Sequence, residues 1–142
     1  MDVEYVRSCG FVAYKQIDDD VCYLIIKSVG GDVGFPKGHM EIGENELETA
    51  IRELKEETNV EVEVVPNFRR AIEYPLLRKP NIMKQSVYFL GKCKNDKIIC
   101  QESEILEANF VSYEKAIELL TFEETKAVLK DARQFINRNK LA

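Results

Sequence analysis

The chain has 142 residues, of which 45% are hydrophobic and 32% charged, and its formal net charge is −5. This composition predicts one folded domain over residues 1–142 and excludes a disordered chain. The negative charge argues against a stable nucleic-acid partner, and no apolar run reaches the roughly 20 residues that span a membrane. The four cysteines lack CxxC spacing, which argues against a zinc site or a disulfide framework and favours a reducing cytoplasm.

The charge is unevenly distributed along the chain. Residues 41–63 contain nine glutamates and two basic residues, whereas residues 67–84 contain five basic residues and one acid. An acidic block followed by a basic block suits a metal site beside a polyanion site. On charge counts alone, two solvated faces explain the same pattern.

Hydrophobic periodicity and turn residues predict strands first, then a helix, more strands and two final helices. In chain order we expect strands at 5–16 and 21–28, a glycine-rich loop at 30–38, a helix from 45 to 59, strands at 61–65, 68–74, 85–93 and 108–111, and helices at 112–120 and 123–137. Prolines 66, 75 and 80 are expected between elements. This order is not the βαβα alternation of a parallel sheet. It predicts an α/β (α+β-like) fold in which helices pack on a mixed sheet as an α/β/α sandwich.

The first helix has clear signals at both ends. Asn45 is a candidate N-cap, and Glu48 stands three residues later, where a capping box requires an acid or amide. Asn59 is expected to end the helix, because asparagine tolerates the left-handed backbone of a C-terminal cap. One apolar stripe follows the helical period: Leu47, Ala50, Ile51 and Leu54.

Three glutamates on this helix lie at the edge of its apolar stripe. Glu53, Glu56 and Glu57 follow the spacing i, i+3, i+4 and therefore share one face. Like charges at i, i+4 repel, and a divalent cation would remove that repulsion. Carboxylate oxygens suit Mg²⁺ or Mn²⁺, and Mg²⁺ is often shared between protein carboxylates and substrate phosphates. A solvated charged face is the alternative for such a trio taken alone.

The residues around the trio form a longer pattern, which is Gly38, five residues, Glu44, seven residues, and then Arg52-Glu53-Leu54-Lys55-Glu56-Glu57-Thr58-Asn59-Val60. The pattern closely resembles the Nudix box, with Asn59 as the one mismatch, where the family has glycine. We expect Gly38 to permit a backbone bend between a strand and the loop. The resemblance implies a loop–helix–loop metal platform and a water attack on a nucleoside diphosphate derivative. It makes Glu53, Glu56, Glu57, Arg52 and Glu44 the catalytic set, with Arg52 orienting carboxylates of the loop.

Further blocks are similar to those of the animal-type asymmetric diadenosine tetraphosphate (Ap₄A) hydrolases: residues 35–39, 46–50, 68–74, 84–90 and 122–135. This resemblance implies hydrolysis of Ap₄A to ATP and AMP, with Mg²⁺ or Mn²⁺ as cofactor and a small dinucleoside polyphosphate as partner. The implied metal ligands are Glu53, Glu56, Glu57, Gly38 and a fourth acid, for which Glu104 fits better than Glu102. The implied substrate-binding residues are Lys37, His39, Arg70, Tyr74, Lys84 and Phe122, with Tyr74 and Phe122 as the adenine sandwich.

Two features leave the substrate more open than the chemistry. The chain has no tryptophan, and Val33 or Phe35 stands where the diadenosine enzymes commonly have one. The segment from Pro75 to Met83 is also longer than in the animal enzymes. Nudix enzymes that act on capped or triphosphorylated RNA 5′ ends, or on other nucleoside-diphosphate derivatives, share much of the same motif. A catalytically silent nucleotide-binding module is an alternative of another class, although all four box glutamates are present.

Overall fold

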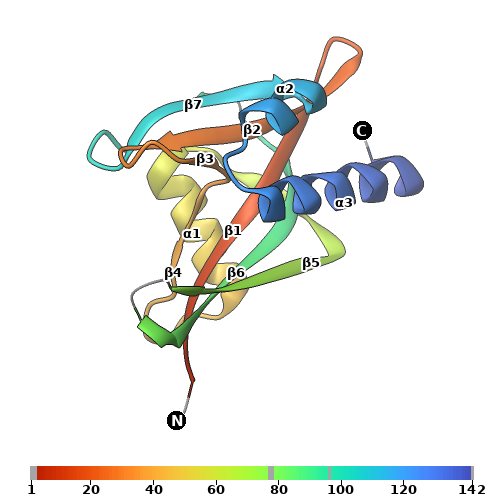
Figure 1. The fold of residues 1–142 in the computed structure, drawn as a ribbon. Helices are drawn as coiled ribbons and strands as arrows, with labels where there is room; N and C mark the ends of the chain where they lie inside the picture. The colour runs from red at the N-terminus through yellow and green to blue at the C-terminus, as the bar shows by residue number, and fades with distance from the viewer. Residues whose placement is uncertain (1–2, 77–78, 96, 142) are drawn as a thin grey trace.

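The computed structural model describes residues 3–76, 79–95 and 97–141. Its elements follow the predicted order of strands, helix, strands and helices (Figure 1). They are β1 (Glu4–Ile17), β2 (Asp20–Ser28), β3 (Val33–Gly34), β4 (Lys37–His39), α1 (Glu46–Thr58), β5 (Val62–Leu76), β6 (Lys79–Cys93), β7 (Ile105–Ser112), α2 (Tyr113–Leu119) and α3 (Glu123–Asn139). Among the described residues, no helix has the length and apolar character that crossing a bilayer requires.

The strands form one mixed sheet, as predicted. Its main order is β3-β2-β1-β6-β5, with β4 paired to β1 and β7 paired to β2. The long central strand β1 runs parallel to β6 and forms the expected antiparallel hairpin with β2. Strand β1 pairs with β2 near its C-terminal end and with the short strand β4 nearer its N-terminal end. It therefore connects the sheet to the segment that precedes α1.

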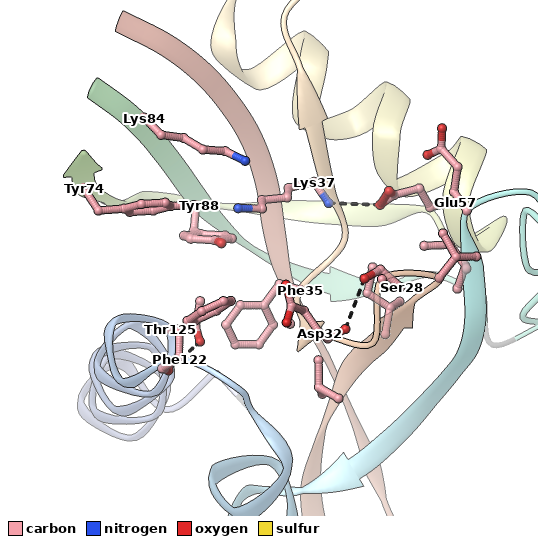
Figure 2. A pocket seen from close by; sticks show the side chains of 17 residues that line it. Ser28, Asp32, Phe35, Lys37, Glu57, Tyr74, Lys84, Tyr88, Phe122 and Thr125 are labelled. Carbon is pink, nitrogen blue, oxygen red and sulfur yellow. Dashed lines mark hydrogen bonds between the residues drawn. The ribbon is translucent and has the colours of Figure 1, made fainter. Parts of the chain in front are cut away.

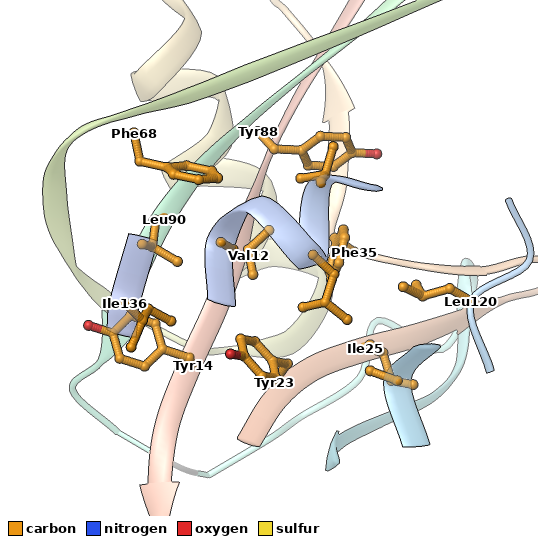
Figure 3. Close-up of a cluster of buried hydrophobic side chains, with 14 of the residues drawn as sticks. Val12, Tyr14, Tyr23, Ile25, Phe35, Phe68, Tyr88, Leu90, Leu120 and Ile136 are labelled. Atoms are coloured by element: carbon orange, nitrogen blue, oxygen red, sulfur yellow. The ribbon is translucent and has the colours of Figure 1, made fainter. Parts of the chain in front are cut away.

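Helices cover both faces of the sheet, which confirms the sandwich. In Figure 1, α1 lies on one side of β1 and β6, and α2 and α3 lie on the other. Successive β1 residues accordingly enter different cores: Phe11 and Ala13 pack in the cluster beneath α1, and Val12 and Tyr14 pack beneath α3. Figure 3 shows the second cluster. A strand that is buried on both faces has no polar alternation, which explains its continuous apolar sequence.

Helix α1 begins and ends as predicted. The Asn45 side chain accepts from the backbone N–H of Glu48 at 2.8 Å, and the Glu48 carboxylate accepts from the N–H of Asn45 at 2.9 Å. Asn59 has the left-handed backbone (φ 67°) expected of the C-terminal cap. Ala50 and Leu54 are buried, but Ile51 is exposed, so the apolar stripe is narrower than predicted.

The structure corrects several sequence-based boundaries. The segment predicted as a loop contains β3 and β4, and β5 is continuous where two strands were expected. Pro66 and Pro75 lie inside β5, and Pro80 lies inside β6, rather than between elements. The β5–β6 register shifts between Val64 and Arg69, and again after Pro75. Pro66 and Pro75 are tolerated because β5 is the last strand of the main sheet path and its bulges interrupt the ladder. Pro80 precedes the β1–β6 register, which begins at Ile82. Arg78, part of the basic stretch, lies outside the described residues.

Candidate active site

Gly38 brings the β4 backbone directly against a carboxylate of α1. A Cβ atom built at Gly38 would collide with the carboxyl carbon and both carboxylate oxygens of Glu53. The expected reason for glycine, a backbone bend, is therefore not the operative one, because Gly38 does not have the positive φ that favours glycine. Glycine is required here because backbone and carboxylate approach so closely.

Arg52 joins the loop to the glutamate face of α1. It bonds both oxygens of Glu44, with Nε–Oε2 at 2.6 Å and Nη2–Oε1 at 3.0 Å. Its Nη1 donates to Glu53 at 2.8 Å and to Glu56 at 3.2 Å. Its Nη2 also donates to the carbonyl oxygen of His39 at 3.0 Å. One planar guanidinium thus fixes three carboxylates and the β4 backbone, a geometry that lysine could not reproduce.

Glu44 holds this arginine from the loop side. Besides Arg52, its carboxylate accepts from the backbone N–H of Glu41 and from the Thr49 hydroxyl, both at 2.9 Å. Hydrogen bonds from Arg52 and then from Glu41 lower the pKa of Glu44 to about 2. A carboxylate with its lone pairs so occupied orients Arg52 and has little capacity left for a metal.

Glu57 is the most buried carboxylate of the trio, at 5% exposure. Its Oε1 accepts from the backbone N–H of Lys37 at 3.0 Å, as Figure 2 shows. Burial, followed by repulsion from Glu53, raises the pKa of Glu57 to about 8. Burial also raises the pKa of Glu53, and Glu104 contributes repulsion to both groups. Several partly buried carboxylates close together repel one another, and a bound cation would remove that repulsion.

These donors fit a hard divalent cation in chemistry, although they are not arranged around a common centre. Within the described part of the chain, no three His, Cys, Asp or Glu side chains form a preassembled metal site. Arg52 accounts for part of this, because its Nη1 bonds Glu53 and Glu56. Glu57 bonds backbone instead and keeps a second oxygen for a ligand. Oxygen donors and mutual repulsion suit Mg²⁺ or Mn²⁺.

A cleft of about 670 Å³ runs past this platform and includes Glu57 in its lining. A second cavity of about 410 Å³ lies on the Gly38 and Glu53 side. Lys37, Lys84 and Glu104 line both, so we treat the two cavities as one continuous cleft. Glu104 belongs to this lining, whereas Glu102 is in neither cavity. The role of Glu104 as a metal ligand stays a prediction.

Two lysines give the cleft its positive charge. Burial, and then repulsion from Lys84, lowers the pKa of Lys37 to about 8. The Lys37 ammonium donates to the Ser86 hydroxyl at 2.9 Å. In Figure 2 the side chain extends away from Glu57 toward Tyr88 and Lys84. Two neighbouring cations opposite a carboxylate platform suit a ligand with several negative charges.

Tyr74 and Phe122 meet at a side pocket of about 140 Å³ that adjoins the cleft. Tyr74 stands opposite Lys84 in the β5–β6 ladder, and Phe122 is the N-cap residue of α3 with 49% exposure. Thr125 and Tyr88 contribute to the same pocket. Two aromatic side chains from separate elements, one largely exposed, can stack on a flat ring.

His39 and Arg70, the other two predicted substrate-binding residues, lie in different surroundings from each other. His39 lines the Gly38 side of the cleft, and the bond that holds it runs through its backbone carbonyl to Arg52. Arg70 lines neither cavity. Its Nε donates to Asp131 of α3 at 3.2 Å, and its guanidinium lies 4.5 Å from the Phe68 ring. Arg69 points to the opposite face and pairs with Glu46, so the expected division of the two arginines is confirmed, but neither lines the cleft.

Three further residues at the site escaped the sequence analysis: Tyr88 and Thr125, which line the cleft, and Ser86, which is buried behind it and bonds Lys37. The strand period contains a signal for two of them. Lys84, Ser86 and Tyr88 alternate along β6, so a substrate-facing Lys84 places the other two on its face. Thr125 had no such signal, because only the docking of α3 brings it to the cleft.

Comparison with known proteins agrees with this geometry. The NUDIX domain model matches residues 11–132, and the chain therefore belongs to the Nudix family. The asymmetrical bis(5′-nucleosyl)-tetraphosphatases of mouse and rat are each 32% identical to it, over 92% of this chain and 95% of theirs. The structure of a Caenorhabditis elegans Ap₄A hydrolase binary complex superposes with a TM-score of 0.85 at 25% identity, covering 93% of this chain and 98% of that one.

Proposed function

We propose that the protein is a Mg²⁺-dependent pyrophosphohydrolase that cleaves Ap₄A asymmetrically to ATP and AMP. One observation carries the proposal: a single cleft connects the Nudix carboxylates, two lysines and an aromatic pocket. The curated relatives, named asymmetrical bis(5′-nucleosyl)-tetraphosphatases, support the same reaction. The substrate chemistry matches this order of groups, with a polyphosphate between flat bases.

The Nudix family generally acts with a divalent metal. Here Glu53, Glu56 and Glu57 would hold Mg²⁺, with the Gly38 carbonyl and Glu104 as further oxygen donors. When bound, the ion polarises phosphoryl oxygens and lowers the pKa of a water molecule. Arg52 keeps two of the glutamates oriented, and Glu44 keeps Arg52 in place.

The remaining groups bind substrate. Lys37 and Lys84 neutralise phosphate charge, and their contribution grows as charge shifts toward the leaving group. Tyr74 and Phe122 stack on one adenine, while His39 lies where a phosphate oxygen could approach. Because the metal platform and the aromatic pocket are fixed, the distance between them selects the phosphorus that is attacked. Arg70 supports the α3 side through Asp131 and Phe68, and a direct phosphate contact for it has no support in this geometry.

We further propose that the chain acts as one domain in a reducing cytoplasm. The domain proposal rests on a family match that spans residues 11–132. The compartment proposal rests on the four cysteines, all of them described and all free thiols.

A substrate panel tests the function. The purified protein is incubated with Ap₄A, capped RNA, triphosphorylated RNA and an inositol pyrophosphate, each with Mg²⁺ and each with excess chelator. We expect Mg²⁺-dependent turnover with Ap₄A as the preferred substrate. Faster turnover of an RNA 5′ end would favour the alternative enzyme, and nucleotide binding without turnover would indicate a silent module.

The aromatic pocket gives a separate prediction. Replacing Tyr74 by alanine removes a stacking surface worth about 1 kcal/mol and should raise the KM for Ap₄A several-fold at nearly unchanged kcat. Tyr74→Phe keeps the ring and should keep the KM. Steady-state kinetics of both variants measure this. An unchanged KM in the alanine variant would place the base elsewhere in the cleft.

A further inference from the structure

Lys37 is held at three separate points, which is unusual for a long, flexible side chain. Its backbone N–H donates to Glu57, and its ammonium donates to Ser86. Its Cβ presses on Gly10 of β1, since a Cβ at Gly10 would lie 2.6 Å from that of Lys37. Gly10 and Lys37 are also register partners in the β1–β4 ladder. Backbone, stem and head of the lysine are therefore all fixed.

Ser86 is the residue that fixes the head. It is fully buried on β6, between its ladder partners Ser8 of β1 and Ile72 of β5. An ammonium can only donate, so the Ser86 hydroxyl oxygen accepts from Lys37. A buried hydroxyl is costly unless it is hydrogen-bonded, and here the contact with Lys37 supplies that bond.

Lys37 needs such an anchor because of its neighbour. Lys84 lines the same cleft, and two ammonium groups that share a cleft repel each other. A lysine ammonium on a four-carbon stem would otherwise rotate away from a like charge and toward water. The contact with Ser86 offsets that tendency and keeps both cations in the cleft.

We propose that Ser86 is a positioning residue for phosphoryl transfer, which fixes the Lys37 ammonium beside Lys84 so that it faces charge developing on the polyphosphate. This inference rests on the proposed function. A polyphosphate ground state offers many anionic oxygens, which a mobile ammonium can still reach. Stabilising the transition state requires a donor that is already in place. Ser86 should consequently affect kcat more than KM.

A double-mutant cycle with Lys37 separates positioning from mere structural support. In Ser86→Ala we expect kcat for Ap₄A to fall about tenfold or more, with KM within about twofold of wild type. Ser86→Cys, which nearly keeps the volume but is a weak acceptor, should behave similarly and provides a second variant if the alanine protein folds poorly. Lys37→Met removes the ammonium, and adding Ser86→Ala to it should lower kcat no further.

The same variants can overturn the proposal. If Ser86→Ala and Ser86→Cys keep the wild-type kcat, or if Ser86→Ala costs the same factor with and without Lys37, Ser86 supports the fold only. Crystal structures of the Ser86→Ala and Ser86→Cys proteins give an arm independent of turnover. We expect the Lys37 ammonium to leave its wild-type position, and an unmoved ammonium would contradict the inference. Absence of Ap₄A hydrolysis by the wild type would instead refute the proposed function. The crystal structures of the variants would still show whether Ser86 holds the Lys37 ammonium in place.

Discussion

Glu57→Gln should lower kcat for Ap₄A by at least about 100-fold, because it removes one buried ligand charge from the proposed metal platform, where several kcal/mol are at stake. The fold should remain, since glutamine has nearly the same shape and its carbonyl can still accept from the Lys37 N–H. The matched control is Glu48→Gln, the same chemical change on the same helix, which keeps the capping box. Steady-state kinetics at saturating Mg²⁺ measure both variants, and near-normal turnover of Glu57→Gln would remove Glu57 from the metal site.

The same variant gives a pH-dependent prediction for the metal-free protein. The pKa of Glu57 is raised to about 8, so the folded state retains a proton that the unfolded state releases near the ordinary glutamate pKa of 4.5. Stability of the wild type should therefore fall as pH rises from about 4.5 to 8. In chelator, the melting temperature of Glu57→Gln should rise relative to that of the wild type as the pH increases across this range. Mg²⁺ should reduce this difference in melting temperature. A difference independent of pH would contradict the assignment.

Arg52→Met should reduce both stability and activity. The change leaves Glu44, Glu53 and Glu56 without their shared guanidinium and releases the His39 carbonyl. Carboxylates that lose this shared cationic partner repel one another, so the metal-free melting temperature should fall by several degrees. Activity should drop at least about tenfold, because the loop and helix ligands lose their common orientation. Thermal unfolding and Mg²⁺ titration of the rate measure the two effects.

Arg52→Lys is the informative comparison. It keeps the charge but loses the planar fork that reaches Glu44 through two nitrogens. We expect it to regain much of the stability and little of the activity. Full activity in the lysine variant would mean that only the charge at this position matters, and not the geometry.

Local signals explain how much of the fold could be predicted. Helix α1 was predicted to within a residue at each end, because Asn45 and Glu48 form a capping box and Asn59 adopts a left-handed cap. The central hairpin of β1 and β2 was likewise evident from short-range patterning. Strands β3 and β4 were missed because they are stabilised by non-local pairing, such as that of Gly10 with Lys37, and contain few strand-forming residues.

The candidate site shows the same division. The box residues stand at fixed spacing on one loop and helix, so the sequence predicts them as a group. Arg70 does not line the cleft, and its guanidinium bonds Asp131 of α3. Strand alternation separates two faces without saying which one lies at the cleft. Ser86 carries no motif at all. Its importance arises from Lys37, 49 positions away, and only the folded chain brings the two together.

Hydrolysis of Ap₄A in ¹⁸O-labelled water, followed by mass spectrometry of the products, tests the central claim most directly. The account predicts ATP and AMP in equal amounts with Mg²⁺ present, because the platform of Glu53, Glu56 and Glu57 and the Tyr74 pocket fix one register. Water attack at the phosphorus of the AMP product places the label in AMP. Two molecules of ADP, or no hydrolysis of Ap₄A with Mg²⁺, would contradict the account. Label in ATP would contradict the proposed point of attack.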